Sequence, residues 1–374
     1  MGVKYTIFAV LAVFLVLAVN PASGAVDTTE IDKVRNKGVL DSEDFRIIDD
    51  FVSEAVQELV QTIDFMSVAK TRLVFLGRSR SVRAAQAQYA GQFSESAYKY
   101  ISSGLEESAN FTPEERKFKA TLNLLILVDG LEDLRLVDLV LPMLNDENAA
   151  ICYWAVHSVT NAGIIEQLNS DKAANLELAR RITGQLKPTV EGAGSEITTL
   201  MAKFAAELDI AQGEALLLQI ADVRISRYAD WRVDCELLDA AILKSLHDKM
   251  SSAGSTKPAI GRRFAQLYSY AMQRYIKDIK GGNFLSDTQK QQLASVLVET
   301  EDKCLGKILG IRQSIIKRSV EQGDIMRLLL EHSRLLGDDT RPGQFALKLN
   351  FDYGQNPDGS RRTAPLALQD PPKP

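Results

Sequence analysis

Histidine and cysteine, which often carry catalysis or bind metals, are few in this chain and lie far apart. Its histidines, His157, His247 and His332, are each expected on a different helix, with no second ligating side chain three or four positions away. The sequence contains no zinc-protease, serine-hydrolase, phosphate-loop or dinucleotide-binding motif. We therefore predict no catalytic residue, no metal site and no cofactor. His332 shares an apolar line with leucines, so we interpret it as a packed histidine.

The cysteines Cys152, Cys235 and Cys304 are odd in number and widely separated, which excludes a disulfide framework and any C-x-x-C site. Cys152 and Cys304 each recur with aliphatic residues at helical spacing. We interpret both as small buried hydrophobes. The sequence leaves open whether one disulfide forms among the three.

A basic cluster offers the main candidate for ligand binding. Arg78, Arg80 and Arg83 fall within seven residues, just before or at the start of a helix expected from about Ser81. Guanidinium groups and a helix N-terminus both favour anions, so the cluster could hold a phosphate or an acidic polymer. The alternative is a solvated loop between two helices.

One short string suggests an enzyme. Glu95-Ser96-Ala97-Tyr98 is similar to the Glu-Ser-x-aromatic start of lytic transglycosylases. The resemblance implies that Glu95 serves as the general acid and then the base at a glycosidic bond. The Gly-Leu-Met-Gln that continues the family's motif does not follow, because Ser102-Ser103-Gly104-Leu105-Glu106 stands there instead. The other interpretation is a solvated helix face.

The composition predicts a folded, mostly helical chain. Of 374 residues, 45% are hydrophobic and 25% are charged, which excludes a disordered chain. Only four of the 11 prolines fall between positions 22 and 341, where a β-rich or loop-rich protein would need many. The net charge is -5, which disfavours nucleic acid as a partner.

The first 25 residues are interpreted as a secretory signal peptide. One positive charge, Lys4, precedes thirteen uninterrupted apolar residues from Ile7 to Val19, and Asn20-Pro21 follows. This apolar run has the length of a signal-peptide core and is shorter than the roughly 20 residues that cross a bilayer. Small residues at 22–25 allow cleavage before Ala25 or before Val26. We expect a soluble periplasmic or extracellular protein, with an uncleaved anchor as the alternative.

Helical patterns fill the middle of the chain. Apolar residues from Ser42 onward recur at three- and four-residue steps, which predicts a long amphipathic helix. At Thr112-Pro113-Glu114-Glu115 we predict a helix start, with Thr112 as the cap, proline in the first position and a glutamate closing a capping box. Further helices are predicted over 176–250 and over about 258–279, 287–303, 305–321 and 323–336.

Residues 131–162 give the most informative pattern. Two apolar helices flank the polar turn 145–148, the first with Pro142 near its end and the second with Ile151, Ala155, Val156 and Val159 inward. This stretch resembles a HEAT repeat, although Cys152 stands where many such repeats carry arginine and the turn lacks the usual proline. The resemblance implies an all-α fold of the α-α superhelix type, a HEAT-like solenoid.

The C-terminal end breaks the helical pattern. Phe345, Leu347, Leu349, Phe351 and Tyr353 alternate with other residues, which predicts one short strand. Turn-forming residues follow, and we expect disorder from about Asn356. The predicted organisation is thus a signal peptide (1–25), an N-terminal helical segment (26–112), a HEAT-like solenoid (113–340) and an extended, partly disordered tail (341–374).

These patterns predict a binding protein. We expect an exported, non-catalytic helical-repeat module that binds a protein partner or a cell-envelope polymer through its exposed face, and that meets the membrane only through its signal peptide. The alternative is a peptidoglycan- or polysaccharide-acting enzyme that uses Glu95. A third hypothesis is that helices within 42–107 form a dimerisation bundle.

Overall fold

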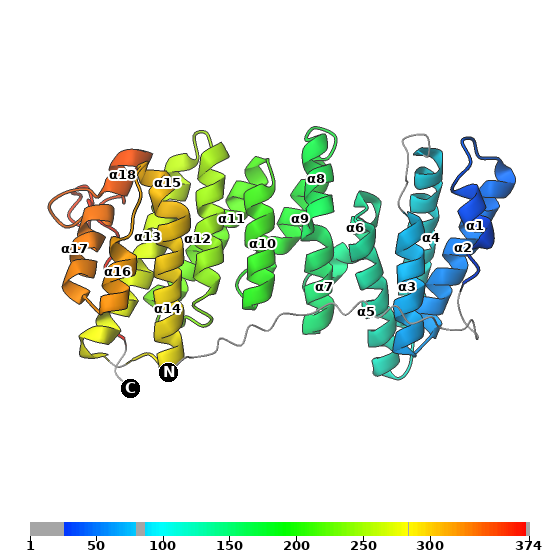
Figure 1. Ribbon diagram of the computed structural model, residues 1–374, viewed down its shortest axis with the longest axis horizontal. Coiled ribbons are helices and arrows are strands. Elements are labelled where there is room, and N and C mark those ends of the chain that lie inside the picture. The colour runs from blue at the N-terminus through cyan, green and yellow to red at the C-terminus, as the bar shows by residue number, and fades with distance from the viewer. Residues whose placement is uncertain (1–25, 80–86, 283, 372–374) are drawn as a thin grey trace. The chain divides into compact units, whose positions relative to one another are not determined.

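The computed structural model describes residues 26–79, 87–282 and 284–371 (Figure 1). Within these ranges the chain is built from helices, and the β-type pairings it contains are two isolated bridges, Gly337 with Pro342 and Gln355 with Arg361. This confirms the all-α class. The chain divides into two compact units, Met1–Ala97 and Tyr98–Pro374, and the dividing point lies within one helix, α4 (Ala87–Ala109).

The first unit contains α1 (Thr29–Val34), α2 (Ser42–Gln61), α3 (Phe65–Ser79) and the first part of α4. The helix predicted from Ser42 is confirmed as α2, and its inward stripe is buried. Asp41 caps α2 by accepting hydrogen bonds from the backbone N–H groups of Glu43 and Asp44. Phe75 stacks edge-on against Phe93, with ring centroids 5.0 Å apart, so aromatic contacts join α3 to α4 in the core.

The second unit begins with helices on either side of the predicted HEAT-like hairpin. Its first seven helices after α4 are α5 (Glu114–Leu131), α6 (Val137–Val140), α7 (Ala149–Thr160), α8 (Ala162–Ser170), α9 (Leu176–Thr189), α10 (Ser195–Glu207) and α11 (Ala211–Ala229).

The remaining helices complete this unit. They are α12 (Leu238–Ser252), α13 (Lys257–Lys277), α14 (Asp287–Thr300), α15 (Gly306–Leu309), α16 (Ile315–Gln322), α17 (Ile325–Leu336) and α18 (Gln344–Leu349). The helix predicted over 305–321 is interrupted, because Gly310 adopts a left-handed backbone (φ 75°) that ends α15.

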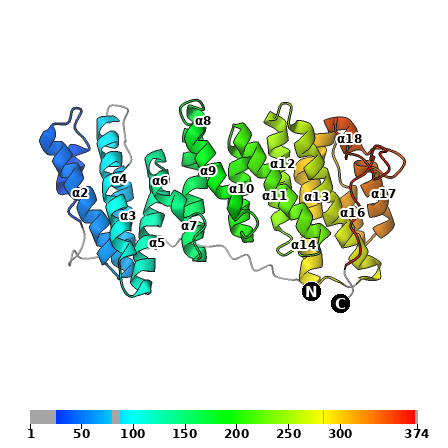
Figure 2. The same cartoon turned by 180° about the vertical axis from the view of Figure 1, so that it is seen from behind.

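The helices of the second unit pack in two rows (Figures 1 and 2). One row contains α7, α10, α12 and α14, each packed on the next, and the other contains α9, α11 and α13, followed by α17. Contacts of α10 with α11, of α12 with α13 and of α13 with α14 join the rows. Each helix therefore buries one face between neighbours, as the near-continuous apolar stretches of the sequence require.

The hairpin predicted over 131–162 is present, but its first arm is broken into three short turns instead of one helix. Its first arm is a 3₁₀ turn (Leu134–Leu136), the single turn of α6 and a second 3₁₀ turn (Leu141–Met143) that contains Pro142. The second arm, α7, is capped by Asn148, and its predicted inward residues are buried. α7 packs more extensively against α5 than against this first arm.

The predicted start of α5 is wrong in detail. The helix begins at Glu114 with Pro113 as the N-cap residue, and no side chain caps it. Proline has no side-chain acceptor, and Thr112 lies one residue too early to occupy the cap position.

The predicted strand over 345–353 is also wrong, because α18 occupies its first part. Phe345, Ala346 and Leu349 are buried, a spacing that suits a helix, whereas Leu347 is 67% exposed. Gly343 lets α18 start close to α17, since a Cβ there would lie 2.2 Å from the carbonyl carbon of Leu336. Beyond α18 the described chain, 350–371, is irregular and makes hydrogen bonds with α13, and the expected disorder from Asn356 stays a prediction.

Candidate functional site

Of the predicted anion-binding cluster, the structure describes only Arg78. Arg78 lies near the end of α3, and its Nη2 atom is 2.8 Å from the Asp32 carboxylate. Its Nη1 atom donates to the carbonyl of Val74. Arg80 and Arg83 lie outside the described residues. Arg78 is thus paired within its own unit, and the cluster remains a prediction from sequence.

Glu95, the residue proposed for glycoside cleavage, lies on the exposed face of α4. Its neighbour Ser96 is buried and donates a hydrogen bond to Asp49 at 2.9 Å. Ser96 therefore helps to hold α4 against α2. Glycoside hydrolases commonly use two carboxyl groups that flank the scissile bond. The exposed position of Glu95 favours the interpretation as a solvated helix face.

The three histidines lie on α7, α12 and α17, as predicted, and each has a partner in its own surroundings. His157 contacts Asp129 at 2.7 Å, and His247 contacts Asp248 at 3.0 Å. His332 contacts the hydroxyl of Ser269 at 2.8 Å, and burial lowers its pKa to about 4. Among the residues that the structure describes, no group of three metal-ligating side chains comes together.

Cys152 and Cys304 are buried, which confirms their interpretation as small hydrophobes. Burial raises the pKa of both thiols, and that of Cys304 reaches about 12. Cys235 is exposed. The three cysteines, all of them in the described part of the chain, are free.

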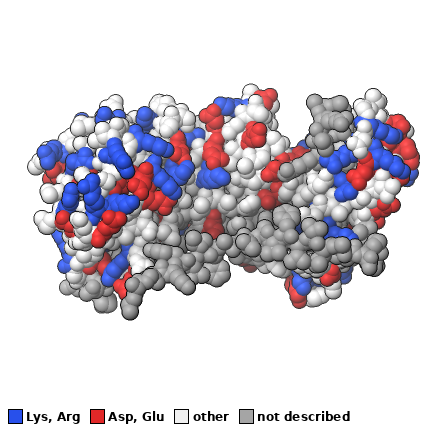
Figure 3. Space-filling model, viewed as in Figure 1, with Lys and Arg blue, Asp and Glu red and all other residues white. Residues whose placement is uncertain are grey.

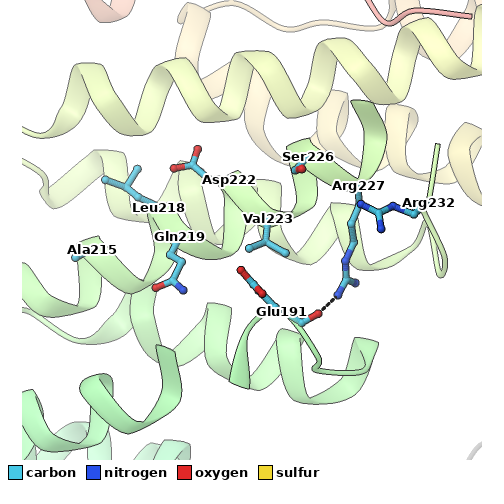
Figure 4. A pocket seen from close by; sticks show the side chains of 9 residues that line it. All are labelled: Glu191, Ala215, Leu218, Gln219, Asp222, Val223, Ser226, Arg227 and Arg232. Carbon is cyan, nitrogen blue, oxygen red and sulfur yellow. Dashed lines mark hydrogen bonds between the residues drawn. The ribbon is translucent and has the colours of Figure 1, made fainter. Parts of the chain in front are cut away.

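The structure contains a hollow that the sequence did not reveal. It has a volume of about 890 Å³ and lies along one face of α11 (Figure 4). Side chains from α11 form most of its wall, and Glu191 and Arg232 complete it from two loops. The residues that line it are Glu191, Ala215, Leu218, Gln219, Asp222, Val223, Ser226, Arg227 and Arg232.

Charged groups of both signs surround this hollow. Arg227 donates to the backbone carbonyl of Glu191 at 2.5 Å, and the Glu191 carboxylate extends into the space between Gln219 and Arg227 (Figure 4). Asp222 accepts two hydrogen bonds, at 3.0 and 3.1 Å, from the guanidinium of Arg263 on α13. Such a paired fork orients the Asp222 carboxylate, so the hollow combines charged groups with the apolar side chains of Ala215, Leu218 and Val223.

A buried ion pair holds α11 in place behind the hollow. Arg224 donates from Nε and Nη2 to Asp239 on α12, at 2.5 and 3.2 Å, and Tyr228 donates to the same carboxylate at 2.5 Å. Burial raises the pKa of Asp239, and Arg224 partly offsets this. Burial by itself would lower the pKa of Arg224, but Asp239 more than offsets it, so the net pKa is raised. The guanidinium therefore stays charged and fixes the rotation of α11 against α12.

The sequence carries only part of the signal for this hollow. Gln219, Asp222 and Ser226 recur at three- and four-residue steps on α11, which is a readable polar stripe. The same stripe is typical of any solvated helix. Glu191 and Arg232 come from loops before and after it, and only the packed structure brings them together.

Across the surface seen in Figure 3, Lys and Arg side chains are interspersed with Asp and Glu over the C-terminal helices. In the described ranges no helix is both long and apolar enough to span a membrane. Comparisons with protein-family models, with curated proteins and with solved structures find no match to this chain.

Proposed function

We propose that this chain is an exported, non-catalytic helical-repeat protein of the HEAT or armadillo type, and that it binds a protein partner as a binding or scaffolding module of the cell envelope. The signal-peptide pattern at 1–25 supports export. The two packed rows of helices in the second unit support a repeat architecture, because stacked helix pairs offer one extended face to a partner.

The hollow along α11 is the observation on which the binding function rests. Its volume of about 890 Å³ suits a short stretch of polypeptide or an equivalent polymer segment. Ala215, Leu218 and Val223 are the apolar residues that line it, while Glu191, Asp222, Arg227 and Arg232 supply both signs of charge. A protein segment matches this mixture better than a polyanion does, and the net charge of -5 gives no attraction for nucleic acid.

The proposal is tested by filling the hollow. Ser226 is exposed at its wall, so Ser226→Trp should occupy the space without disturbing the core. Ser295→Trp, at an exposed position on α14, is the matched control. After crosslinking and purification from the exported fraction, wild type and Ser295→Trp should retain a partner, and Ser226→Trp should recover at least tenfold less of it.

Two outcomes would contradict the proposal. Equal recovery of partner by Ser226→Trp and wild type would show that the hollow is not the binding site. Recovery of the protein alone, together with cleavage of cell-wall glycan that Glu95→Gln abolishes, would establish the enzyme alternative instead.

A further inference from the structure

The last described residues of the chain lie along α13 and are held there by side-chain amides (Figure 2). Gln266 accepts a hydrogen bond from the backbone N–H of Leu366 at 2.9 Å and donates to the carbonyl of the same residue at 3.3 Å. Gln273 donates to the Leu366 carbonyl at 3.3 Å and accepts from the Leu368 N–H at 2.7 Å. Two glutamines of one helix thus satisfy three backbone groups of the tail.

This arrangement holds a polypeptide backbone much as a neighbouring strand does. In an extended segment, the N–H and C=O groups of alternate residues point to the same edge, and here the groups of Leu366 and Leu368 both meet α13. Contacts to main-chain groups do not depend on the side chains of the bound segment. The two glutamines can therefore hold any segment that runs in this register.

Side chains at the end of the tail add selectivity. Leu368 is 2% exposed and is the apolar anchor, whereas Leu366 is 46% exposed. Asp370 forms an ion pair with Lys277 at the end of α13. The indole Nε1 of Trp231 donates to the carbonyl of Gln369 at 3.0 Å. The bound segment is thus recognised by one buried leucine and by an acidic residue two positions later.

The residues that receive the tail are positioned by contacts of their own. The guanidinium of Arg274 lies 5.6 Å from the Trp231 ring and is paired with the buried Glu236 at 3.2 Å. Phe284 packs edge-on against the same indole. Gln266 and Gln273 project from α13, which is buried along most of its length. The receiving residues of α13 and Trp231 thus have packing and ion-pair neighbours outside the tail.

We propose that Trp231, Gln266, Gln273 and Lys277, named here the tail groove, form a binding site for an extended segment of a partner protein, with a leucine two residues before an acidic residue. Residues 366–370 of the chain itself occupy this groove as an intramolecular competitor. The tail groove is separate from the hollow along α11, and the proposal goes beyond the function proposed above. A tethered segment acts at an effective concentration of about a millimolar, so a partner binds only by displacing the tail.

The test uses the full chain and a labelled synthetic peptide of residues 363–371 as the probe. Leu368→Ser weakens the hold on the tethered tail and leaves the groove intact. It should therefore raise the affinity for the peptide at least tenfold over wild type, as measured by fluorescence anisotropy. Adding Gln266→Ala and Gln273→Ala to that variant should lower the affinity at least tenfold, whereas adding the exposed Gln291→Ala on α14 should leave it unchanged.

A second variant keeps the test decisive if Leu368→Ser fails to fold. Asp370 is 83% exposed, so Asp370→Ala cannot disturb the core, and it should raise the affinity for the peptide about twofold to fivefold. If folded Leu368→Ser and Asp370→Ala chains both bind the peptide no better than wild type, the tail is a fixed part of the fold and the proposal is wrong. Ser226→Trp should not change peptide binding, so the two proposals fail independently.

Discussion

Asp239 shows how much a single buried carboxylate contributes to the position of α11. Its side chain is 0% exposed and accepts three hydrogen bonds, two from Arg224 and one from Tyr228. Arg224 is itself 2% exposed. A buried charge without its partner is strongly destabilising, because desolvation is then no longer offset by attraction. The pair therefore makes the rotation of α11, and with it the hollow, dependent on one residue of α12.

Asp239→Asn should reduce the free energy of unfolding by about 3–5 kcal/mol, since it leaves the buried Arg224 guanidinium with only the exposed Asp234 carboxylate, 3.5 Å away, as a counter-charge. Asp222→Asn is the matched control, because Asp222 is also paired with an arginine but is 52% exposed. The control should cost less than about 1 kcal/mol. Urea denaturation of both variants gives the comparison, and equal losses would show that burial does not set the strength of the Arg224–Asp239 pair.

His332 makes the stability of the protein depend on pH. Burial lowers its pKa to about 4, against an ordinary value of 6.5. Between these values the unfolded chain binds more protons, so stability is present above about pH 6.5 and is lost as the pH falls toward 4. On going from pH 7.5 to 5.0, wild type should lose about 2 kcal/mol more than His332→Gln does. Urea unfolding at the two pH values measures this, and equal acid losses would contradict the assignment.

At the scale of the helix, apolar spacing predicted most elements correctly. The helix from Ser42, the second arm at 149–160 and the helices near 258–279 and 323–336 are all present. Among the predicted helices, the errors lie at ends and breaks. Capping depends on which residue reaches the first turn, and the break at Gly310 depends on a left-handed backbone, so neither follows from apolar spacing.

The segment at 344–349 shows why spacing can mislead. A strand and a helix would both bury Phe345 and Leu349, so the two patterns differ only in whether residue 346 or residue 347 faces inward. The sequence offers alanine and leucine at these positions, which favours the strand. In the structure α18 forms instead, and Phe345 packs on Phe264 of α13 with ring centroids 5.8 Å apart.

Phe345→Ala should destabilise the protein by about 3–5 kcal/mol, because the phenyl ring is fully buried and its removal leaves a cavity. Leu347→Ala should cost less than about 1 kcal/mol, since Leu347 is 67% exposed on the helix. The two variants are compared by thermal and urea unfolding. A strand would bury both side chains on one face, so similar losses would restore the strand prediction.

At the scale of the whole molecule, the sequence predicts the class of the fold but not its binding surfaces. The hollow joins Glu191 to residues of α11 and to Arg232, and the tail groove joins Gln266 to Leu366, 100 positions later. No local sequence pattern predicts which of these distant residues come together, because their contacts depend on how the helices stack. The predicted domain limits at 112 and 340 stay a prediction, and the described units meet within α4.

The proposed function in the cell envelope requires that the whole chain is exported, and export can be tested directly. Intact-mass spectrometry of the protein from the exported fraction should show a chain that begins at Ala25 or Val26, since small residues at 22–25 follow the apolar run. Leu11→Arg places a charge in the middle of that run, so it should leave the uncleaved precursor inside the cell. A full-length chain recovered from the membrane would instead support an uncleaved anchor, and the partner would then be sought at the membrane surface.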